Sequence, residues 1–222
     1  MCGRYSQAQE QKLLIPRYQA ELTETMITPR FNIAPTQNAV VVVEEGKRQI
    51  KMMRWGLIPH WAKDASIGNK MINARAETIA EKPSFRGPLK NQRCLIPADG
   101  FFEWLQEGKG KAPMCVVLKD EPIFSFAGLW DRWKDPDGKS VDTFTIVTTE
   151  ANELLKPIHD RMPVILTREA EKTWLDPRIT EPERLLPLLR PFPAERMATY
   201  RVSPRVNSPK NDDRGIVDPL SP

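Results

Sequence analysis

Apolar and polar residues alternate in short segments along most of the chain, a pattern typical of β-strands. Residues 40–43 are four consecutive valines, and the turn-forming residues 44–47 separate them from a second strand at 49–55. The same pattern predicts a short strand at 71–76 and further strands near 93–97, 101–105, 113–118, 123–130 and 143–148. Glycine-containing turns at 108–110 and 135–138 connect neighbouring strands, so we expect a mainly antiparallel sheet or partial barrel.

Helical patterns are fewer and shorter. One is predicted over 6–24, with Ser6 as its N-cap and a break at Pro16. Others are predicted as a turn at 77–82 and as helices at 151–155, 168–175 and 183–189, whereas residues 56–70 have the composition of a loop. No linker divides the chain, so we expect one α+β domain over residues 1–222, with a barrel-like sheet, a few short peripheral helices and a flexible end of about ten residues.

Composition narrows the classes of function. Lys+Arg 33 against Asp+Glu 29 gives a net charge of +4, which permits a polyanionic partner without requiring one. Three cysteines without a close pair and two histidines disfavour a disulfide framework and a zinc site, so we expect no metal and no cofactor. The start of the chain lacks an apolar signal region, and no apolar run approaches the length of a membrane span. We therefore expect a cytoplasmic protein, nuclear in a eukaryote, with no membrane partner.

Cys2 is the first candidate for chemistry because of its position. Removal of Met1 would leave a cysteine that carries both an α-amine and a thiol. An α-amine has an ordinary pKa of about 7.7–8.0, so part of it is neutral and nucleophilic near pH 7. Such an amine can form a Schiff base with an aldehyde, and the thiol can then close a five-membered thiazolidine ring. The alternative is that Cys2 is a small buried apolar residue.

Asn73 and Arg75 lie two residues apart in a predicted strand. Side chains at this spacing project from the same face, which would direct an amide and a guanidinium toward one phosphate or sugar. A hydrogen-bonded surface pair with no further role would produce the same pattern.

Three other positions each have two interpretations. Glu103 lies within an aromatic segment, where burial would raise its pKa toward neutrality and suit it to acid–base catalysis, unless it faces water on an edge strand. His159 is two residues from Arg161 and could share a site with it, or could be a hydrogen-bonded core histidine. Trp61 follows a predicted strand and could stack on a nucleobase or anchor its loop.

These segments recur together, in order, in a known family. They are residues 1–4 (MCGR), 31–35 (FNIAP), 54–59 (RWGLIP), 71–77 (MINARAE), 94–104 (CLIPADGFFEW), 126–130 (FAGLW), 146–149 (IVTT), 158–163 (IHDRMP) and 206–208 (VNS). The chain resembles the SRAP family, the SOS-response-associated peptidases or abasic-site processing proteins, from Met1 to about Asp212. No single segment is diagnostic, but the combined set is highly specific.

The resemblance implies an α+β domain around a β-barrel-like sheet, with the N-terminal cysteine at the floor of a positively charged DNA-binding groove. It also implies an activity. The family binds single-stranded DNA and forms a covalent thiazolidine link to the ring-opened sugar of an abasic site. We therefore expect a DNA–protein cross-linking enzyme whose partner is single-stranded DNA containing abasic sites, and we expect it to be a monomer.

The same resemblance implies the roles of the catalytic residues. Cys2 would react through its amine and its sulfur, and Asn73 would orient the sugar or the amine. Glu103 would transfer protons during ring opening and during slow reversal of the link. His159 would act at the sugar oxygen or the neighbouring phosphate.

Five further residues are implied to contact DNA. Arg4, Arg75 and Arg161 would hold the phosphates that flank the lesion. Pro35 and Trp61 would lie where the DNA bends and a neighbouring base stacks. Some relatives carry two adjacent aromatic residues at this point, but here Trp61 is followed by Ala62, so a preference for single-strand/duplex junctions is less secure.

Two other functions fit part of the pattern. A thiol peptidase could use Cys2 as nucleophile, His159 as base and Glu103 to orient the base, and the family's peptidase-like reaction is removal of its own Met1. A non-catalytic module could bind single strands without needing Cys2. A side activity as an abasic-site lyase is also expected, because a Schiff base that the thiol fails to trap can undergo β-elimination.

Overall fold

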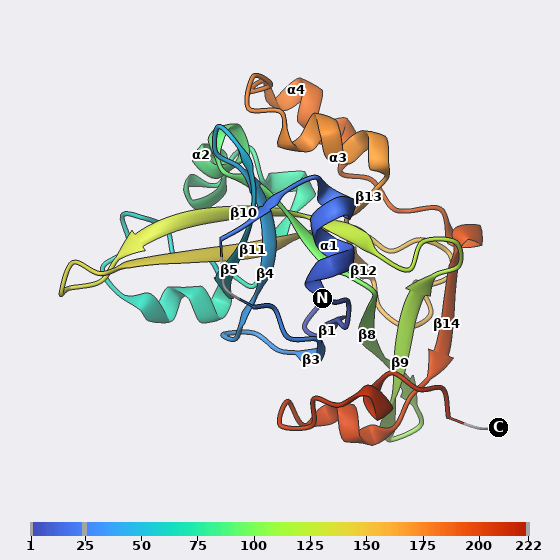
Figure 1. Cartoon of the computed structure of the whole chain (residues 1–222). Coiled ribbons are helices and arrows are strands. Elements are labelled where there is room, and N and C mark those ends of the chain that lie inside the picture. Colours follow the sequence, from blue (N-terminus) through green and yellow to red (C-terminus); the bar gives the residue numbers. More distant parts are fainter. Residues whose placement is uncertain (1, 24–25, 221–222) are drawn as a thin grey trace.

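The computed structural model describes residues 2–23 and 26–220 (Figure 1). Its strands are β1 (Tyr5–Gln7), β2 (Glu21–Leu22), β3 (Arg30–Ile33), β4 (Asn38–Glu44), β5 (Arg48–Trp55), β6 (Asn73–Arg75), β7 (Arg93–Ala98), β8 (Gly100–Glu107), β9 (Gly110–Leu118), β10 (Phe124–Lys134), β11 (Ser140–Glu150), β12 (Arg161–Pro163), β13 (Ile165–Leu166) and β14 (Met197–Arg201). Its α-helices are α1 (Gln11–Tyr18), α2 (Pro83–Asn91), α3 (Arg168–Leu175) and α4 (Pro182–Leu185), and its short 3-10 helices are η1 (Ala65–Lys70), η2 (Ala76–Thr78), η3 (Leu186–Leu188), η4 (Ala194–Arg196), η5 (Pro204–Asn207) and η6 (Arg214–Ile216).

Within the described residues these strands form two sheets. In the larger one, β4 pairs with β5 and β7, β10 pairs with β7 and β11, and a parallel pairing of β11 with β5 closes the five strands into a barrel. The smaller sheet has the order β14-β9-β8-β1-β3 and is antiparallel throughout. The short helices lie around the outside of the strands (Figure 1). The predicted single α+β domain with a mainly antiparallel, barrel-like sheet is confirmed.

The four-valine run shows why β4 is apolar at every position. Val41 and Val43 pack into the cluster that contains Cys2 and that joins the barrel strands to the smaller sheet. Val40 and Val42 face the other way, toward a second cluster built with residues of α1, α2 and α3. Because both faces of the strand are covered, polar alternation would bury unpaired polar groups, and a continuous apolar run results.

The prediction of a helix over residues 6–24 is wrong. Residues 5–7 form strand β1, whose Tyr5 pairs with Ile33 of β3 and with Phe101 of β8, so long-range pairing overrides the local capping signal of Ser6. The helix begins at residue 11, and Pro16 lies within it instead of splitting it. Residues 24 and 25 at the end of the predicted helix lie outside the described residues.

Among the other predicted helices, one is confirmed and one is wrong. Helix α3 is confirmed with the expected bounds, and Thr167 Oγ1 caps it by accepting a hydrogen bond from the amide of Ala170 (3.2 Å). Residues 151–155 were expected to be helical but are not, and residues 153–155 form turns. Helix α2 was not predicted, because Pro83, Gly87 and Pro88 are poor helix formers, although proline suits the first helical turn.

The end of the chain follows the smaller sheet. The amide of Leu220 donates to Arg201 O (2.9 Å), and Val202 forms an isolated bridge with Pro219. Within the segment that was expected to be flexible, Pro219 and Leu220 thus pair with β14 and the residue that follows it, and Val217 O accepts from the Tyr200 hydroxyl of β14 (3.0 Å). Among residues 2–23 and 26–220, no helix has the length and apolar character needed to cross a membrane.

Gly128 in β10 tests how tightly the barrel is packed. A Cβ added there would lie 2.2 Å from Ile96 Cδ1, 2.9 Å from Cys94 Sγ and 3.0 Å from Thr145 O. We expect Gly128→Ala to lower the free energy of unfolding by about 1–3 kcal/mol, the usual cost of overpacking. Urea denaturation measures it. The control is Gly110→Ala, where the nearest atom would lie at 3.7 Å, and its effect should stay within about 0.5 kcal/mol. Equal effects of the two substitutions would contradict tight packing at residue 128.

Candidate functional site

Cys2 lies at the junction of the two sheets. It is fully buried, in the same apolar cluster as Tyr5, Phe101 and Val116. Burial raises the pKa of its thiol well above the ordinary value, and the nearby carboxylate of Glu103 raises it further. The resting thiol is therefore neutral. Met1, whose removal we expect, lies outside the described residues.

Glu103 occupies the inner face of β8. It lies two residues beyond Phe101, so both side chains project from the face of the strand that covers the Cys2 cluster. Its side chain is buried, which raises the pKa of the carboxyl from 4.5 to about 7, and the charge of Asp160 adds to this rise. A carboxyl with this pKa can both donate and accept a proton near neutral pH. The alternative in which Glu103 faces water is wrong.

His159 stands in the turn that precedes β12. The amide of Arg161 donates to its Nδ1 (2.9 Å), while the Asp160 carboxylate also lies 2.7 Å from that atom. These two contacts require different protonation states of Nδ1. We assign the neutral ring with its hydrogen on Nε2, because the amide is fixed and the exposed Asp160 carboxylate can turn into water. Burial also lowers the pKa of His159, which favours the neutral ring.

Asn73 is placed by strand β6, which runs parallel to β11 with Asn73 opposite Ile146 of the Cys2 cluster. Its Nδ2 donates to Ile72 O (3.0 Å). Its Oδ1 is buried and accepts no hydrogen bond from any described residue. A buried acceptor of this kind suits an incoming hydroxyl or amine donor. Arg75 shares the strand face with Asn73, as predicted, and is exposed.

Arg161 in β12 is already paired. Its Nη1 and Nη2 donate to the two carboxylate oxygens of Glu77 (2.7 and 2.9 Å), and Nη2 also donates to Thr148 O (2.7 Å). The hydrogen bonds from Arg161 lower the pKa of Glu77, which therefore stays charged at neutral pH. Any phosphate that approaches Arg161 must compete with this carboxylate.

Arg4 is held differently. Its Nη1 donates to Asn32 Oδ1 (2.8 Å) and to Val206 O (2.5 Å), and its Cζ lies 5.9 Å from the centre of the Trp104 ring. Burial lowers the pKa of Arg4, yet a guanidinium remains protonated at neutral pH. These partners are uncharged, so they fix the cation without neutralising it.

Pro35 lies in the turn after β3. The amide of Gln37 donates to Ala34 O (3.3 Å) across this turn, and Thr36 takes a φ of 74°. A β-branched residue at such a φ is strained, and strained turns are concentrated at functional sites.

Trp61 lies on the loop after β5, with 52% of its surface exposed. The loop is fastened on both sides of it, by the His60 amide donating to Asp131 Oδ2 (2.9 Å) and by Trp133 Nε1 donating to Ala62 O (2.7 Å). Because its neighbours anchor the loop, Trp61 is not needed as an anchor and presents its indole to solvent.

Electrostatic contacts join the central residues into one site. The charge of Glu103 raises the pKa of the Cys2 thiol, and the charge of Asp160, the neighbour of His159, raises the pKa of Glu103. Lys111 lowers the pKa of both Glu103 and His159. The structure thus brings together Cys2, Glu103 and the His159 turn.

A hollow of about 470 Å³ lies on the other face of the smaller sheet. Ser6, Gly100, Cys115 and Tyr200 are among the residues that line it. Ser6 and the buried Tyr5 point to opposite faces of β1, so this hollow faces away from Cys2. Within the described residues no group of three or more His, Cys, Asp or Glu side chains is arranged to hold a metal ion.

Comparison with known proteins identifies the family. The family model described as SOS response associated peptidase (SRAP) matches residues 1–209. The chain belongs to the SRAP family. It is 49% identical over 222 residues to the abasic site processing protein YoqW of Bacillus subtilis (98% of this chain, 99% of that protein) and 34% identical over 232 residues to HMCES of Gallus gallus, also named an abasic site processing protein (90% and 68%).

Two solved structures match the fold. The crystal structure of a Bacteroides thetaiotaomicron protein superposes with a TM-score of 0.91 at 34% identity, covering 99% of this chain and 100% of that one. A Bordetella bronchiseptica protein superposes with a TM-score of 0.79 at 25% identity.

Sequence reasoning missed the residues that hold the arginines. Glu77 belongs to the 71–77 motif but had no assigned role, and its spacing from Arg161 gives no hint that they meet. Asn32 belongs to the 31–35 motif, and only the fold shows that it holds Arg4.

Glu103 makes stability depend on pH. Its pKa is higher in the folded state than in the unfolded state, so below about pH 4.5 the carboxyl is neutral in both and costs nothing. As the pH rises from about 4.5 to about 7, the unfolded chain ionises more readily than the buried group does, so the fold loses stability, by roughly 3 kcal/mol at most. We expect Glu103→Gln to gain unfolding free energy relative to the wild type, and to gain more of it at pH 8 than at pH 4. Urea denaturation at the two pH values measures this gain.

The control for this prediction is Glu153→Gln, which changes an exposed carboxylate. Its stability relative to the wild type should be nearly the same at both pH values. If wild type and Glu103→Gln differ in their free energy of unfolding by the same amount at pH 4 and at pH 8, the raised pKa of Glu103 is contradicted.

Proposed function

We propose that this protein processes abasic sites in single-stranded DNA by forming a covalent thiazolidine cross-link through Cys2. The observation that carries the proposal is a buried, neutral Cys2 thiol within electrostatic reach of a carboxyl whose pKa is about 7. The naming of its relatives as abasic site processing proteins supports the substrate class.

The reaction balances without a cofactor. After removal of Met1, the α-amine of Cys2 attacks the aldehyde of the ring-opened abasic sugar, and loss of one water gives an imine. The Cys2 S–H then adds across the C=N bond, so that sulfur bonds to carbon and the proton passes to nitrogen. Glu103 is suited to donate the proton that water departure needs and to accept the thiol proton, because its pKa is near neutrality.

Asn73 and His159 complete the proposed site. The buried Oδ1 of Asn73 offers an acceptor to a sugar hydroxyl or to the reacting amine. The neutral ring of His159, with its hydrogen on Nε2, is a donor for the sugar oxygen or the adjacent phosphate.

The DNA-contacting residues follow the family pattern. Arg4, Arg75 and Arg161 would bind phosphates that flank the lesion. The exposed indole of Trp61 would stack on a base, and Pro35 would lie at the bend. An abasic sugar has no base to unstack, so presenting it to a buried Cys2 costs little.

The peptidase alternative is disfavoured by the electrostatics. Thiol peptidases react through a thiolate, which requires a lowered thiol pKa. Burial and Glu103 raise the pKa of Cys2 instead. In the proposed reaction the amine attacks first, and a neutral thiol is no obstacle to it.

The decisive experiment mixes purified protein with a single-stranded oligonucleotide that carries one abasic site. We expect a heat-stable band on a denaturing gel whose mass equals protein without Met1 plus DNA minus one water. An undamaged oligonucleotide should give no such band. Absence of the band from protein shown to lack Met1 would overturn the proposal.

Two variants separate the alternatives. Cys2→Ala that has lost Met1 keeps a terminal amine but lacks the thiol, so it should form the imine without trapping it and should nick the strand by β-elimination. A one-residue extension before Cys2 removes the reacting amine and should abolish the cross-link, whereas a thiol peptidase would tolerate it. A non-catalytic binding module would bind DNA equally well in all three forms and cross-link in none.

Glu77 should limit the contribution of Arg161 to binding. Glu77→Gln removes the competing charge, so we expect tighter binding of undamaged single strands and a slope of log Kobs against log[salt] that is steeper by about 0.7, one additional phosphate contact. Fluorescence anisotropy measures both. Asp176→Asn is the matched control, because it removes the same charge from a bidentate pair with Arg178. An equal effect of the two variants would indicate general electrostatics and not release of Arg161.

A further inference from the structure

Asn32 in β3 is a fully buried polar residue with partners on both ends of its amide. Its Oδ1 accepts from Arg4, as described above, and its Nδ2 faces three backbone carbonyls of the C-terminal segment, those of Val206 (3.2 Å), Ser208 (3.1 Å) and Asn211 (2.7 Å). Residues 206–212 are called the C-terminal clamp from here on. Through Asn32 the clamp is connected to the guanidinium that lies two residues after Cys2.

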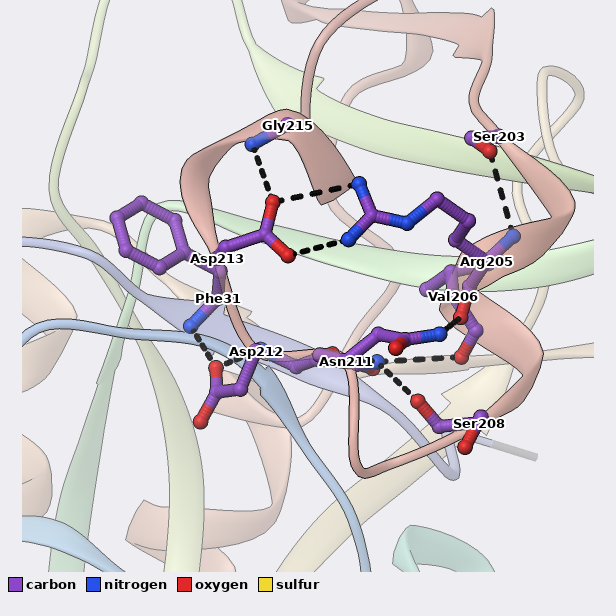
Figure 2. A network of polar contacts seen from close by, with 10 residues as sticks. Phe31, Ser203, Arg205, Val206, Ser208, Asn211, Asp212, Asp213 and Gly215 are labelled. Carbon is purple, nitrogen blue, oxygen red and sulfur yellow. Dashed lines mark hydrogen bonds and ion pairs between the residues drawn. The ribbon is translucent and has the colours of Figure 1, made fainter.

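Asp212 fastens the clamp to the backbone of β3. Its Oδ1 accepts from the amides of Phe31 (2.5 Å) and Asn32 (2.9 Å). Figure 2 shows that neighbouring Asp213 points away from β3, toward Arg205 and the amide of Gly215. The two adjacent carboxylates therefore have different partners, and of the two it is Asp212 that accepts from the β3 backbone.

A second branch leads from Asp212 to the turn that carries Pro35. Arg30 Nε donates to Asp212 Oδ2, and Arg30 Nη2 donates to Gln37 Oε1 (2.9 Å). The same Gln37 oxygen accepts from the amide of Ala34 (3.1 Å). The clamp thus supports the turn in which Thr36 is strained.

A third branch reaches Trp104. Asn207 of the clamp accepts a hydrogen bond from Trp104 Nε1 at its Oδ1 (2.7 Å). The Trp104 ring is the one that lies against Arg4. Arg4 is therefore held by Asn32, by Val206 O and by a ring that the clamp itself orients.

We propose that the C-terminal clamp is part of the DNA-binding site, with Asn32 and Asp212 as positioning residues for Arg4 and for the Pro35 turn. The inference rests on the proposed function, which assigns Arg4 and Pro35 to DNA. A long, flexible arginine loses side-chain entropy when it binds a phosphate, and an arginine fixed beforehand loses less. The clamp fixes Arg4 with uncharged partners and so preserves its charge for the phosphate.

The test compares Asp212→Ala with Asp213→Ala in the full chain. Each removes one carboxylate and its ion pair, with Arg30 for Asp212 and with Arg205 for Asp213. Asp212→Ala also removes the two hydrogen bonds from β3 amides, whereas Asp213→Ala removes one from the Gly215 amide and none from β3. Binding of an undamaged single-stranded oligonucleotide is measured by fluorescence anisotropy over a range of salt concentrations. Urea denaturation reports the stability of each variant separately.

We expect Asp212→Ala to bind several-fold more weakly and to lower the slope of log Kobs against log[salt] by about 0.7, the loss of one phosphate contact, while Asp213→Ala keeps the wild-type slope. A merely less stable protein would not change this slope. Asp212→Asn should retain the slope, because its amide oxygen can still accept from both β3 amides. If Asp212→Ala does not fold, Asn207→Ala, at an exposed position, should lower the affinity and the slope in the same direction.

Equal salt slopes for Asp212→Ala and Asp213→Ala would overturn the proposed role of the clamp. A wild-type salt slope for Arg4→Ala would overturn it as well. Capture of an abasic oligonucleotide by the wild type is followed in parallel. A wild type that binds but does not capture would refute the proposed chemistry, and the slopes would still decide whether the clamp positions Arg4.

Discussion

The burial of β1 between the two sheets is the constraint on which the rest of the site depends. The strand belongs to the smaller sheet, between β3 and β8, yet Tyr5 packs edge-on against the barrel residues Trp55 and Phe126, with ring centres 5.1 and 5.8 Å apart. This contact fixes which face of β1 is internal. Cys2 then lies in the core, while Arg4, on the alternate face, is directed toward Asn32 and the C-terminal clamp.

Desolvation at this junction also sets the protonation of the site. Burial disfavours charge on every group, so it raises the pKa of the Cys2 thiol and of the Glu103 carboxyl and lowers that of the His159 ring. The groups around Cys2 are thereby held close to neutral forms. The same effect makes ionised Glu103 a cost to folding, and a fold optimised for stability alone would carry an apolar residue there.

Local sequence patterns predicted the elements whose stability is local or whose two faces are covered. The valine run of β4, the hairpin turns and helix α3 follow from periodicity and turn residues. Strand β1 could not be predicted in this way, because three residues become a strand only when β3 and β8 pair with them from positions far along the chain.

The candidate site shows the same limit. Motif resemblance selected Cys2, Asn73, Glu103 and His159, and strand alternation placed Asn73 beside Arg75. The contacts that hold Arg4 lie outside that reasoning, because Asn32 meets Asn211 across 179 positions of sequence. A local sequence pattern cannot predict a contact between residues so far apart in the chain, and only the three-dimensional structure shows it.

The two paired arginines illustrate what the fold adds to a motif. Arg161 and Arg4 have the same side chain and the same expected ligand, but Arg161 meets the carboxylate of Glu77 whereas Arg4 meets an amide oxygen, a backbone carbonyl and an aromatic ring. A carboxylate orients a guanidinium and cancels its charge, so a phosphate gains little Coulomb energy until the pair opens. Neutral partners orient it and leave the charge in place. In the proposed reaction, Arg4, which follows Cys2 by two residues, would therefore be the cation prepared for the phosphate beside the sugar, and Arg161 would contribute only where DNA displaces Glu77.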